Sequence, residues 1–202
     1  MSNVQAALPW ATWLEGVTEG LNVDLTDYEA KLERTIRGDE TDEQLTVVLV
    51  KNALENIDET NPDWTYVASR LYVKHLYREA ARNRGNDEAN PYDNFYGLIE
   101  TLVDKGIYTS SLLDKYTKKD IDLFNENINA KRDNLFNYLA LYTLATRYLT
   151  TDHEKRVFEL PQERWMIIAM HLMQDEPAEK RPELVLEAYW ALSNLYMTVA
   201  AP

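Results

Sequence analysis

The side chains that could carry out thiol, metal or acid–base chemistry are few and scattered along this chain. None of its 202 residues is a cysteine, which excludes disulfides, thiolate–zinc sites and thiol catalysis within it. Its histidines are His75, His153 and His171, and none has a second histidine at the four-residue spacing of a helical metal site. We therefore expect surface or core histidines, with no metal site and no catalytic residue in this chain.

Carboxylates are abundant, but they cluster at predicted helix starts, where the helix dipole favours negative charge. An acid–base pair needs two carboxylates forced together in a pocket, and no pattern indicates one, so we interpret the acidic residues as solvated faces. One long predicted helix ends in a basic cluster: His75, Arg78, Arg82 and Arg84. Cations are favoured at the C-terminal end of a helix by its dipole. The alternative is that the cluster binds phosphate. Phosphate loops, dinucleotide-binding glycine motifs and serine-nucleophile motifs are absent from the sequence.

The composition limits the classes of partner. A formal net charge of −13 repels phosphate backbones, so we expect no nucleic-acid polymer partner, while a single nucleotide needs only a few local cations. No run approaches the roughly 18 apolar residues that span a bilayer, and the N-terminus lacks a signal-peptide pattern. We expect a cytoplasmic protein without membrane contact.

Local start signals predict a succession of helices that position these side chains. Thr26–Glu29 and Thr41–Gln44 match the capping box, in which a threonine and a carboxylate or amide bond the first free N–H groups. Asn61–Pro62 and Asn90–Pro91 match an N-cap followed by proline in the first turn. Further helices are expected to begin at Thr117, Asp133, Pro161 and Pro182.

Apolar spacing predicts which faces are buried. After Asp133 we expect Leu135, Tyr138, Leu139 and Tyr142 to face inward; after Pro161, Trp165, Ile168, Ala169 and Leu172; and in the last helix, Val185, Ala188, Tyr189 and Leu192. The tryptophans lie in amphipathic patterns, where core packing or a seam between domains is expected: Trp10, Trp13, Trp64, Trp165 and Trp190.

One change of period interrupts the helices. Residues 147–150 and 156–160 are short and rich in β-branched and aromatic residues, and a polar stretch separates them, which predicts a small β-hairpin. Residues 82–90 are polar and predict a linker between subdomains. We expect an all-α fold with one minor hairpin, divided into residues 1–85, 86–150 and 151–202.

Motifs in order along the chain, from about Glu19 to Pro202, resemble the large subunit of a class I ribonucleotide reductase. The segment Asn61–Leu71 resembles the last helix of an ATP-cone. Leu113–Thr117 and Arg132–Asp133 are similar to helices that precede the catalytic barrel. The remaining motifs resemble the family's short hairpin, its first barrel-domain helix and the approach to its substrate loop: Arg147–Leu149, Glu159–Glu163 and Met197–Pro202.

The resemblance implies an N-terminal fragment: a truncated ATP-cone-like helical domain, a helical collar, and the hairpin and first helices of the barrel domain. The ten-stranded α/β barrel, with its radical cysteine and redox pair, is missing. The implied function is that of the N-terminal regulatory and structural segment of ribonucleoside-diphosphate reductase, which reduces ribonucleotides to deoxyribonucleotides for DNA synthesis. Implied partners are the remaining part of the large subunit, a second large subunit, the ribonucleotide substrate and a small subunit that generates a radical with its own metal cofactor.

The resemblance also places candidate binding residues. Thr41 matches a threonine that contacts the allosteric effector, ATP or dATP, and Arg78 stands where a lysine is usual. The basic hairpin that closes an intact cone is replaced by Ala7–Trp10 and a helix, so we expect weak effector binding or none. Ala201 stands where the family has a threonine or serine at the substrate diphosphate. The alternative is a stand-alone helical binding or nucleotide-sensing module without catalysis.

Overall fold

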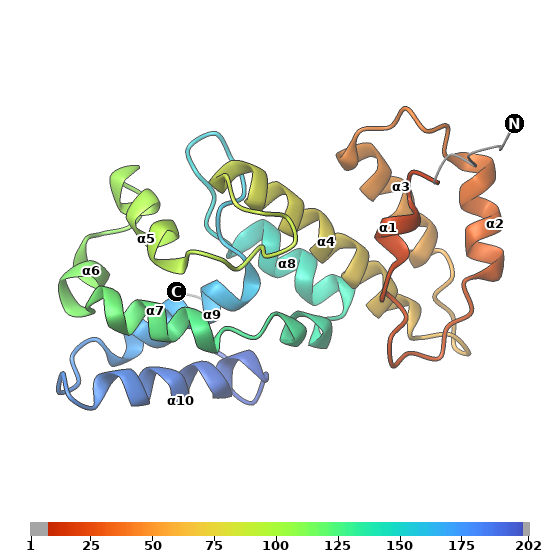
Figure 1. The fold of residues 1–202 in the computed structure, drawn as a ribbon. Coiled ribbons are helices and arrows are strands. Elements are labelled where there is room, and N and C mark those ends of the chain that lie inside the picture. The colour runs from red at the N-terminus through yellow and green to blue at the C-terminus, as the bar shows by residue number, and fades with distance from the viewer. Residues whose placement is uncertain (1–7, 200–202) are drawn as a thin grey trace, which may run out of the picture. The chain divides into compact units, whose positions relative to one another are not determined.

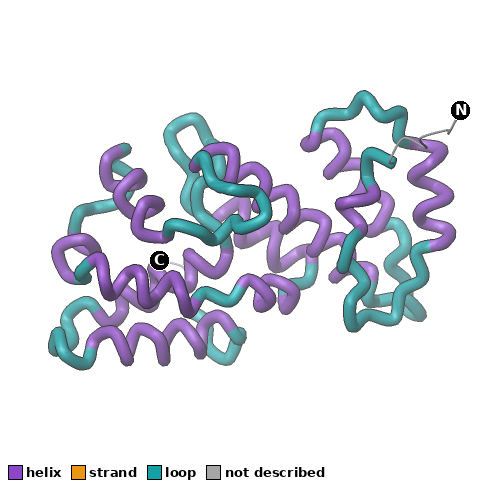
Figure 2. The backbone as a smooth tube through the Cα atoms, viewed as in Figure 1, coloured by secondary structure: helices purple, strands orange, loops and turns teal. Residues whose placement is uncertain are grey.

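The computed structural model describes residues 8–199, in which helices are joined by turns and loops (Figure 1). The elements are α1 (Ala11–Leu14), α2 (Thr26–Thr35), α3 (Asp42–Leu54), α4 (Trp64–Arg84), α5 (Phe95–Asp104), α6 (Ser111–Lys115), α7 (Lys118–Asn127), the 3-10 helix η1 (Ala130–Leu135), α8 (Tyr138–Arg147), α9 (Pro161–Met173) and α10 (Arg181–Ser193). Within this range no strand is formed (Figure 2), so the predicted all-α class is confirmed.

The chain forms two compact units, which are described separately. Among the described residues, unit 1 comprises residues 8–75 and 136–142, and unit 2 comprises residues 76–135 and 143–199. The boundary therefore falls inside α4, between His75 and Leu76. The three-part division at residues 85 and 150 stays a prediction.

Unit 1 packs α1, α2, α3 and the first half of α4 around Trp13, Leu32, Leu49 and Leu71, which are at most 2% exposed. Helix α3 begins with the predicted capping box: the Thr41 hydroxyl accepts from the Gln44 N–H at 3.3 Å, and the Gln44 side chain accepts from the Thr41 N–H at 3.0 Å. Each cap of this kind stabilises a helix by about 1 kcal/mol.

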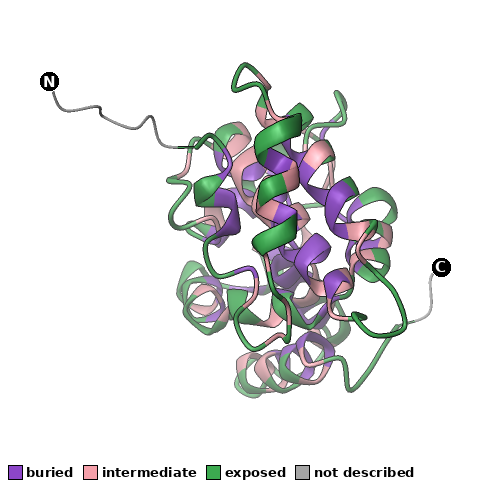
Figure 3. Cartoon of the chain, turned by 90° about the vertical axis from the view of Figure 1, so that its right-hand side faces the viewer, coloured by how far each residue is buried: buried purple, intermediate pink, exposed green. Residues whose placement is uncertain are grey.

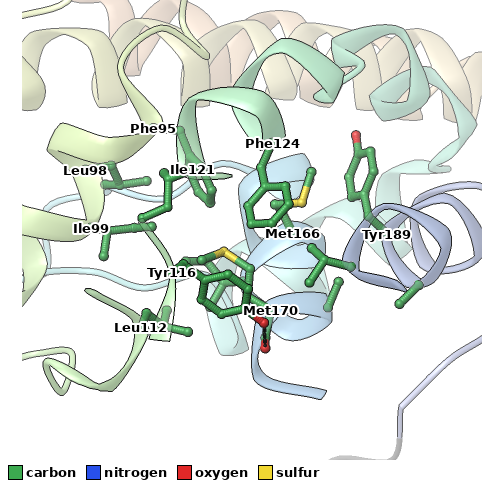
Figure 4. Close-up of a cluster of buried hydrophobic side chains, with 14 of the residues drawn as sticks. Phe95, Leu98, Ile99, Leu112, Tyr116, Ile121, Phe124, Met166, Met170 and Tyr189 are labelled. Carbon is green, nitrogen blue, oxygen red and sulfur yellow. Dashed lines mark hydrogen bonds between the residues drawn. The ribbon is translucent and has the colours of Figure 1, made fainter. Parts of the chain in front are cut away.

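Unit 2 has its own core, built by α5, α6, α7, α9 and α10. Figure 4 shows side chains from α5, α7 and α9 directed toward one another, among them Phe95, Phe124 and Met166, which are all 0% exposed. Burying each such side chain contributes about 1.5–3 kcal/mol. The predicted inward stripe of the last helix is confirmed at its four positions: Val185, Ala188, Tyr189 and Leu192.

Helices in both units show a buried and an exposed side (Figure 3), but several predicted faces and starts were wrong. Leu139 is 72% exposed, whereas Leu141 and Leu144 are buried, so the inward face of α8 is rotated from the predicted one. Asp133 does not start a helix; it lies buried within η1. In α9 the core face contains Met166 and Met170. Of the four residues predicted to face inward, only Ala169 is fully buried. Trp165 and Ile168 are partly buried, and Leu172 is 50% exposed.

Three predicted helix caps, at Thr26, Asn61 and Asn90, were wrong. Asp24, not Thr26, accepts at the start of α2, where its carboxylate bonds the Thr26 N–H at 2.9 Å. Helix α4 begins at Trp64, because the Asn61 side chain donates to Asp58 and leaves Pro62 in a turn. Helix α5 begins after Asn94, whose side-chain Oδ1 accepts from the Gly97 N–H at 3.0 Å, so Pro91 also lies in a turn.

The predicted hairpin is reduced to a single antiparallel bridge between Thr151 and Val157. Carboxylates bind N–H groups that a strand ladder would use. Asp152 accepts from the backbone of Glu154 and Arg156, both at 3.0 Å, and Glu159 accepts from Thr150 at 2.7 Å. Since these N–H groups are occupied, the segment turns back without forming strands.

Candidate functional site

The residues predicted to bind the effector lie in different units. Thr41 belongs to unit 1, is exposed, and uses its hydroxyl to cap α3. Arg78 belongs to unit 2, where its Nε lies 3.7 Å from a carboxylate oxygen of Glu88. Ala201, the predicted substrate contact, lies outside the described residues. Thr41 and Arg78 are each engaged by residues of their own unit.

Unit 1 begins with the predicted helix, α1, and side chains of α4 bond to the backbone of residues 12–19. Arg70 is 9% exposed, and its Nη1 donates to the carbonyls of Val17 at 2.9 Å and Glu19 at 2.8 Å. Lys74 donates to three carbonyls of residues 12–15. Two cations of α4 therefore bind backbone carbonyls of this chain.

The members of the basic cluster at the end of α4 are engaged in different ways. The Arg84 side chain is 5% exposed and its Nη1 lies 2.8 Å from the Glu163 carboxylate. The same guanidinium donates to the Asp93 carbonyl at 2.8 Å. The His75 ring stacks on Tyr72 with centroids 6.2 Å apart. Arg84 is thus a buried structural cation.

A buried polar network, which the sequence did not predict, lies in unit 2 around Asp133. Its carboxylate is 1% exposed and accepts from the Tyr77 hydroxyl at 2.5 Å, the Tyr92 hydroxyl at 2.6 Å and the Gln162 amide at 2.7 Å. Tyr189 donates to the other end of the Gln162 amide at 3.1 Å. These five residues, the Asp133 network, join α4, the α4–α5 loop, η1, α9 and α10.

Two further buried carboxylates flank the network. Glu163 accepts from the Leu160 N–H at 2.8 Å, which caps α9, and pairs with Arg84 from α4. Glu159 is paired with Arg164 at 2.8 Å and accepts from the Tyr108 hydroxyl at 2.7 Å. Both glutamates are 0% exposed. A buried charge is tolerated only when it is paired and hydrogen-bonded, and both glutamates are.

Burial shifts the acid–base properties of this region. It raises the pKa of Asp133 to about 6, although three hydrogen bonds oppose the shift by favouring the carboxylate. Burial also raises the pKa of Glu163 to about 7, against the effect of Arg84. The pKa values of Tyr77 and Tyr92 lie well above their usual range, first because of burial and then because of the nearby Asp133 charge.

The geometry assigns these groups a structural role. Both oxygens of the Asp133 carboxylate are bonded to side chains of the same unit, and the network is buried. The carboxylate is therefore not accessible to a substrate. Within residues 8–199, no group of three or more His, Asp or Glu side chains could hold a metal ion. None of the helices in that range is long and apolar enough to cross a membrane.

The sequence contained a signal for these buried groups. Gln162 precedes Met166 and Ala169 by four and seven residues, Glu163 precedes Met166 and Met170 by three and seven, and all five are buried in α9. Polar residues at positions of a buried stripe therefore indicated an internal network.

Comparisons with known proteins agree on one family. Residues 134–202 match the model of the ribonucleotide reductase all-alpha domain. The alpha subunit of ribonucleoside-diphosphate reductase from Helicobacter pylori is 33% identical over 184 residues, which cover 91% of this chain and 22% of that protein. The corresponding subunit of Enterobacteria phage T4 is 29% identical over 94% of this chain and 24% of its own length. Subunit alpha of reductase 1 from Escherichia coli is 25% identical over 100% of this chain and 25% of its own length.

Each of these three matches covers nearly all of this chain but only a small share of the relative. The helical fold of residues 8–199 agrees with the all-alpha domain that the family model describes. The chain belongs to the family of ribonucleotide reductase large subunits and spans between 22% and 25% of the length of these relatives.

Proposed function

We propose that this chain forms the N-terminal regulatory and structural segment of a ribonucleoside-diphosphate reductase large subunit. The observation that carries the proposal is the 33% identity with a reductase alpha subunit over 184 residues. The whole enzyme would reduce ribonucleotides to deoxyribonucleotides. Because this chain contains no cysteine, the thiols for that reduction must come from the rest of the large subunit.

The structural part of this role falls to unit 2. The Asp133 network and the Arg84–Glu163 pair tie α4, η1, α9 and α10 together inside a region that overlaps the matched family domain. Buried polar groups whose partners are all present favour a single arrangement over competing ones. We infer that unit 2 is a rigid platform on which the rest of the large subunit assembles.

The regulatory part is reduced in this chain. An effector triphosphate needs several cations converging on one site, each charge-assisted bond contributing about 1.5–3 kcal/mol. Thr41 already caps α3, Arg78 lies beside Glu88, and the formal net charge is −13. These features support a degenerate ATP-cone that retains the helices and binds ATP or dATP weakly or not at all.

The partners of the proposal are the rest of the large subunit, a second large subunit and the small subunit that supplies the radical from its metal cofactor. Assembly can be tested directly by co-expressing this chain with the rest of the large subunit as a separate polypeptide. We expect the two to co-elute as a stable complex. A well-folded remainder that never associates with this chain would contradict the proposal.

A further inference from the structure

A hollow lined by apolar and acidic side chains lies on the surface of unit 2 between α7 and α10, which run side by side (Figure 1). Its lining combines four apolar residues with two carboxylates: Leu123, Glu183, Leu186, Glu187, Trp190 and Ala191. The hollow is separate from the Asp133 network, which is buried, and the proposed function does not use it.

Large apolar side chains at this hollow are unusually exposed. Leu123 is 39% exposed and Trp190 is 54% exposed. Tyr196, which is 75% exposed, stacks on Trp190 with ring centroids 5.1 Å apart and planes at 27°. A contiguous exposed apolar patch of this kind marks an interaction surface, and tryptophan and tyrosine are the residues most enriched where binding energy concentrates.

The turn after α10 places the second ring. Leu195 has a φ of 61°, a left-handed conformation that a leucine rarely adopts. This turn lets the Tyr196 N–H donate to the Ala191 carbonyl at 3.0 Å and brings the chain back along α10. The strained residue therefore holds the Trp190–Tyr196 pair on the surface.

The charge of the hollow selects the chemistry of its occupant. Glu183 and Glu187 are one helical turn apart on α10, both exposed, and among the described residues no lysine, arginine or histidine lines the hollow. An acidic peptide or a phosphate backbone would be repelled. Two copies of the hollow facing each other would bring these four carboxylates together, which disfavours self-association.

We propose that this hollow binds an amphipathic helix of a partner protein, with an apolar stripe flanked by lysine or arginine. The groove between two adjacent helices accepts the side-chain ridge of a third helix. The stripe would cover Leu123, Leu186 and Trp190, while the flanking cations would pair with Glu183 and Glu187. This inference goes beyond the proposed function and does not depend on it.

The test is a selection from a phage-displayed library of helical 15-residue peptides against the 202-residue chain, followed by titration of the selected peptides. We expect enrichment of amphipathic sequences that carry both leucine stripes and basic residues. Binding should weaken at least about tenfold in Trp190→Ser and in Glu183→Lys/Glu187→Lys. Thermal melts of the variants verify that they remain folded.

Matched controls separate the hollow from general stickiness and net charge. Leu139→Ser removes another exposed apolar side chain, and Glu43→Lys/Glu179→Lys makes the same change in charge elsewhere; both should bind like the original chain. A library that yields no peptide, or yields acidic peptides, overturns the proposal. Selected peptides that bind Trp190→Ser as tightly as the original chain also overturn it. A concentration-dependent dimer that is lost in Trp190→Ser would assign the hollow to a second copy of this chain instead.

Discussion

Replacing Asp133 is the sharpest perturbation of the unit 2 platform. Asp133→Ala removes the acceptor of Tyr77, Tyr92 and Gln162 at a site that is 1% exposed. Each buried donor left without a partner costs about 1–3 kcal/mol. The two tyrosine rings lie 5.6 Å apart, so their hydroxyls can recover part of that loss by bonding each other. We therefore expect Asp133→Ala to lower the free energy of unfolding by about 3–5 kcal/mol at pH 7.

The matched variant Asp133→Asn keeps the shape and one accepting oxygen, while its amide can donate to a tyrosine hydroxyl. We expect a loss of about 1–2 kcal/mol for this variant. Asp104→Ala, an exposed carboxylate in the same unit, should change stability by less than about 0.5 kcal/mol.

Urea unfolding followed by circular dichroism measures the total effect, and hydrogen exchange of α9 and α10 peptides assigns it to unit 2. A loss below about 1 kcal/mol in Asp133→Ala, or equal losses in the Ala and Asn variants, would refute the network's structural role.

Three other predictions follow from the same structure. Burial raises the pKa of Asp133 to about 6 and of Glu163 to about 7, above their unfolded values near 4. Folded unit 2 therefore holds these two protons more tightly, so the contribution of Asp133 and Glu163 to its stability is greatest below about pH 4 and falls as pH rises through 6–7. Asp133→Asn should remove about 1 kcal/mol of the fall between pH 5 and pH 8 in urea titrations; an unchanged pH slope would contradict this. Arg84→Met leaves Glu163 buried without its cation and should cost about 3–5 kcal/mol at pH 8 and less at pH 5, whereas the exposed-pair control Lys118→Met should cost below about 0.5 kcal/mol. Isothermal titration with ATP and dATP should give a dissociation constant of about 1 mM or weaker, about 4 kcal/mol of binding; micromolar dATP binding lost in Arg78→Ala would show a working effector site.

Local signals in the sequence predicted the elements whose stabilising partners lie within one helical turn. The box at Thr41, the helix start at Thr117 and the proline at Pro161 are confirmed, because each cap bonds to residues at most three positions away. Helix α2 begins at Thr26 as the sequence indicated, but the predicted capping box was wrong, because Thr26 is the first helical residue and its N–H is bonded by Asp24. A capping signal therefore fails when a neighbouring carboxylate competes for the same donors.

The pairing within the Asp133 network could not be predicted from composition or spacing, because its partners are distant in sequence. Asp133 bonds Tyr77 across 56 positions and Gln162 across 29 positions, and Arg84 pairs with Glu163 across 79. The spacing within α9 marks Gln162 and Glu163 as buried, but a single sequence does not show which distant residues they bond. The face of α8 was mispredicted for a related reason: Leu139 and Tyr142 fit a helical stripe as well as the buried Leu141 and Leu144 do.

The most direct test of the proposed function is a ribonucleotide reduction assay. Labelled ribonucleoside diphosphate is incubated with a reductant and this chain, alone and then with the rest of the large subunit and the small subunit. We expect no deoxynucleotide from the chain alone, because it contains no cysteine, and turnover that depends on this chain when all parts are present. Deoxynucleotide formed by the purified chain alone, or full turnover by the other parts without it, would contradict the account.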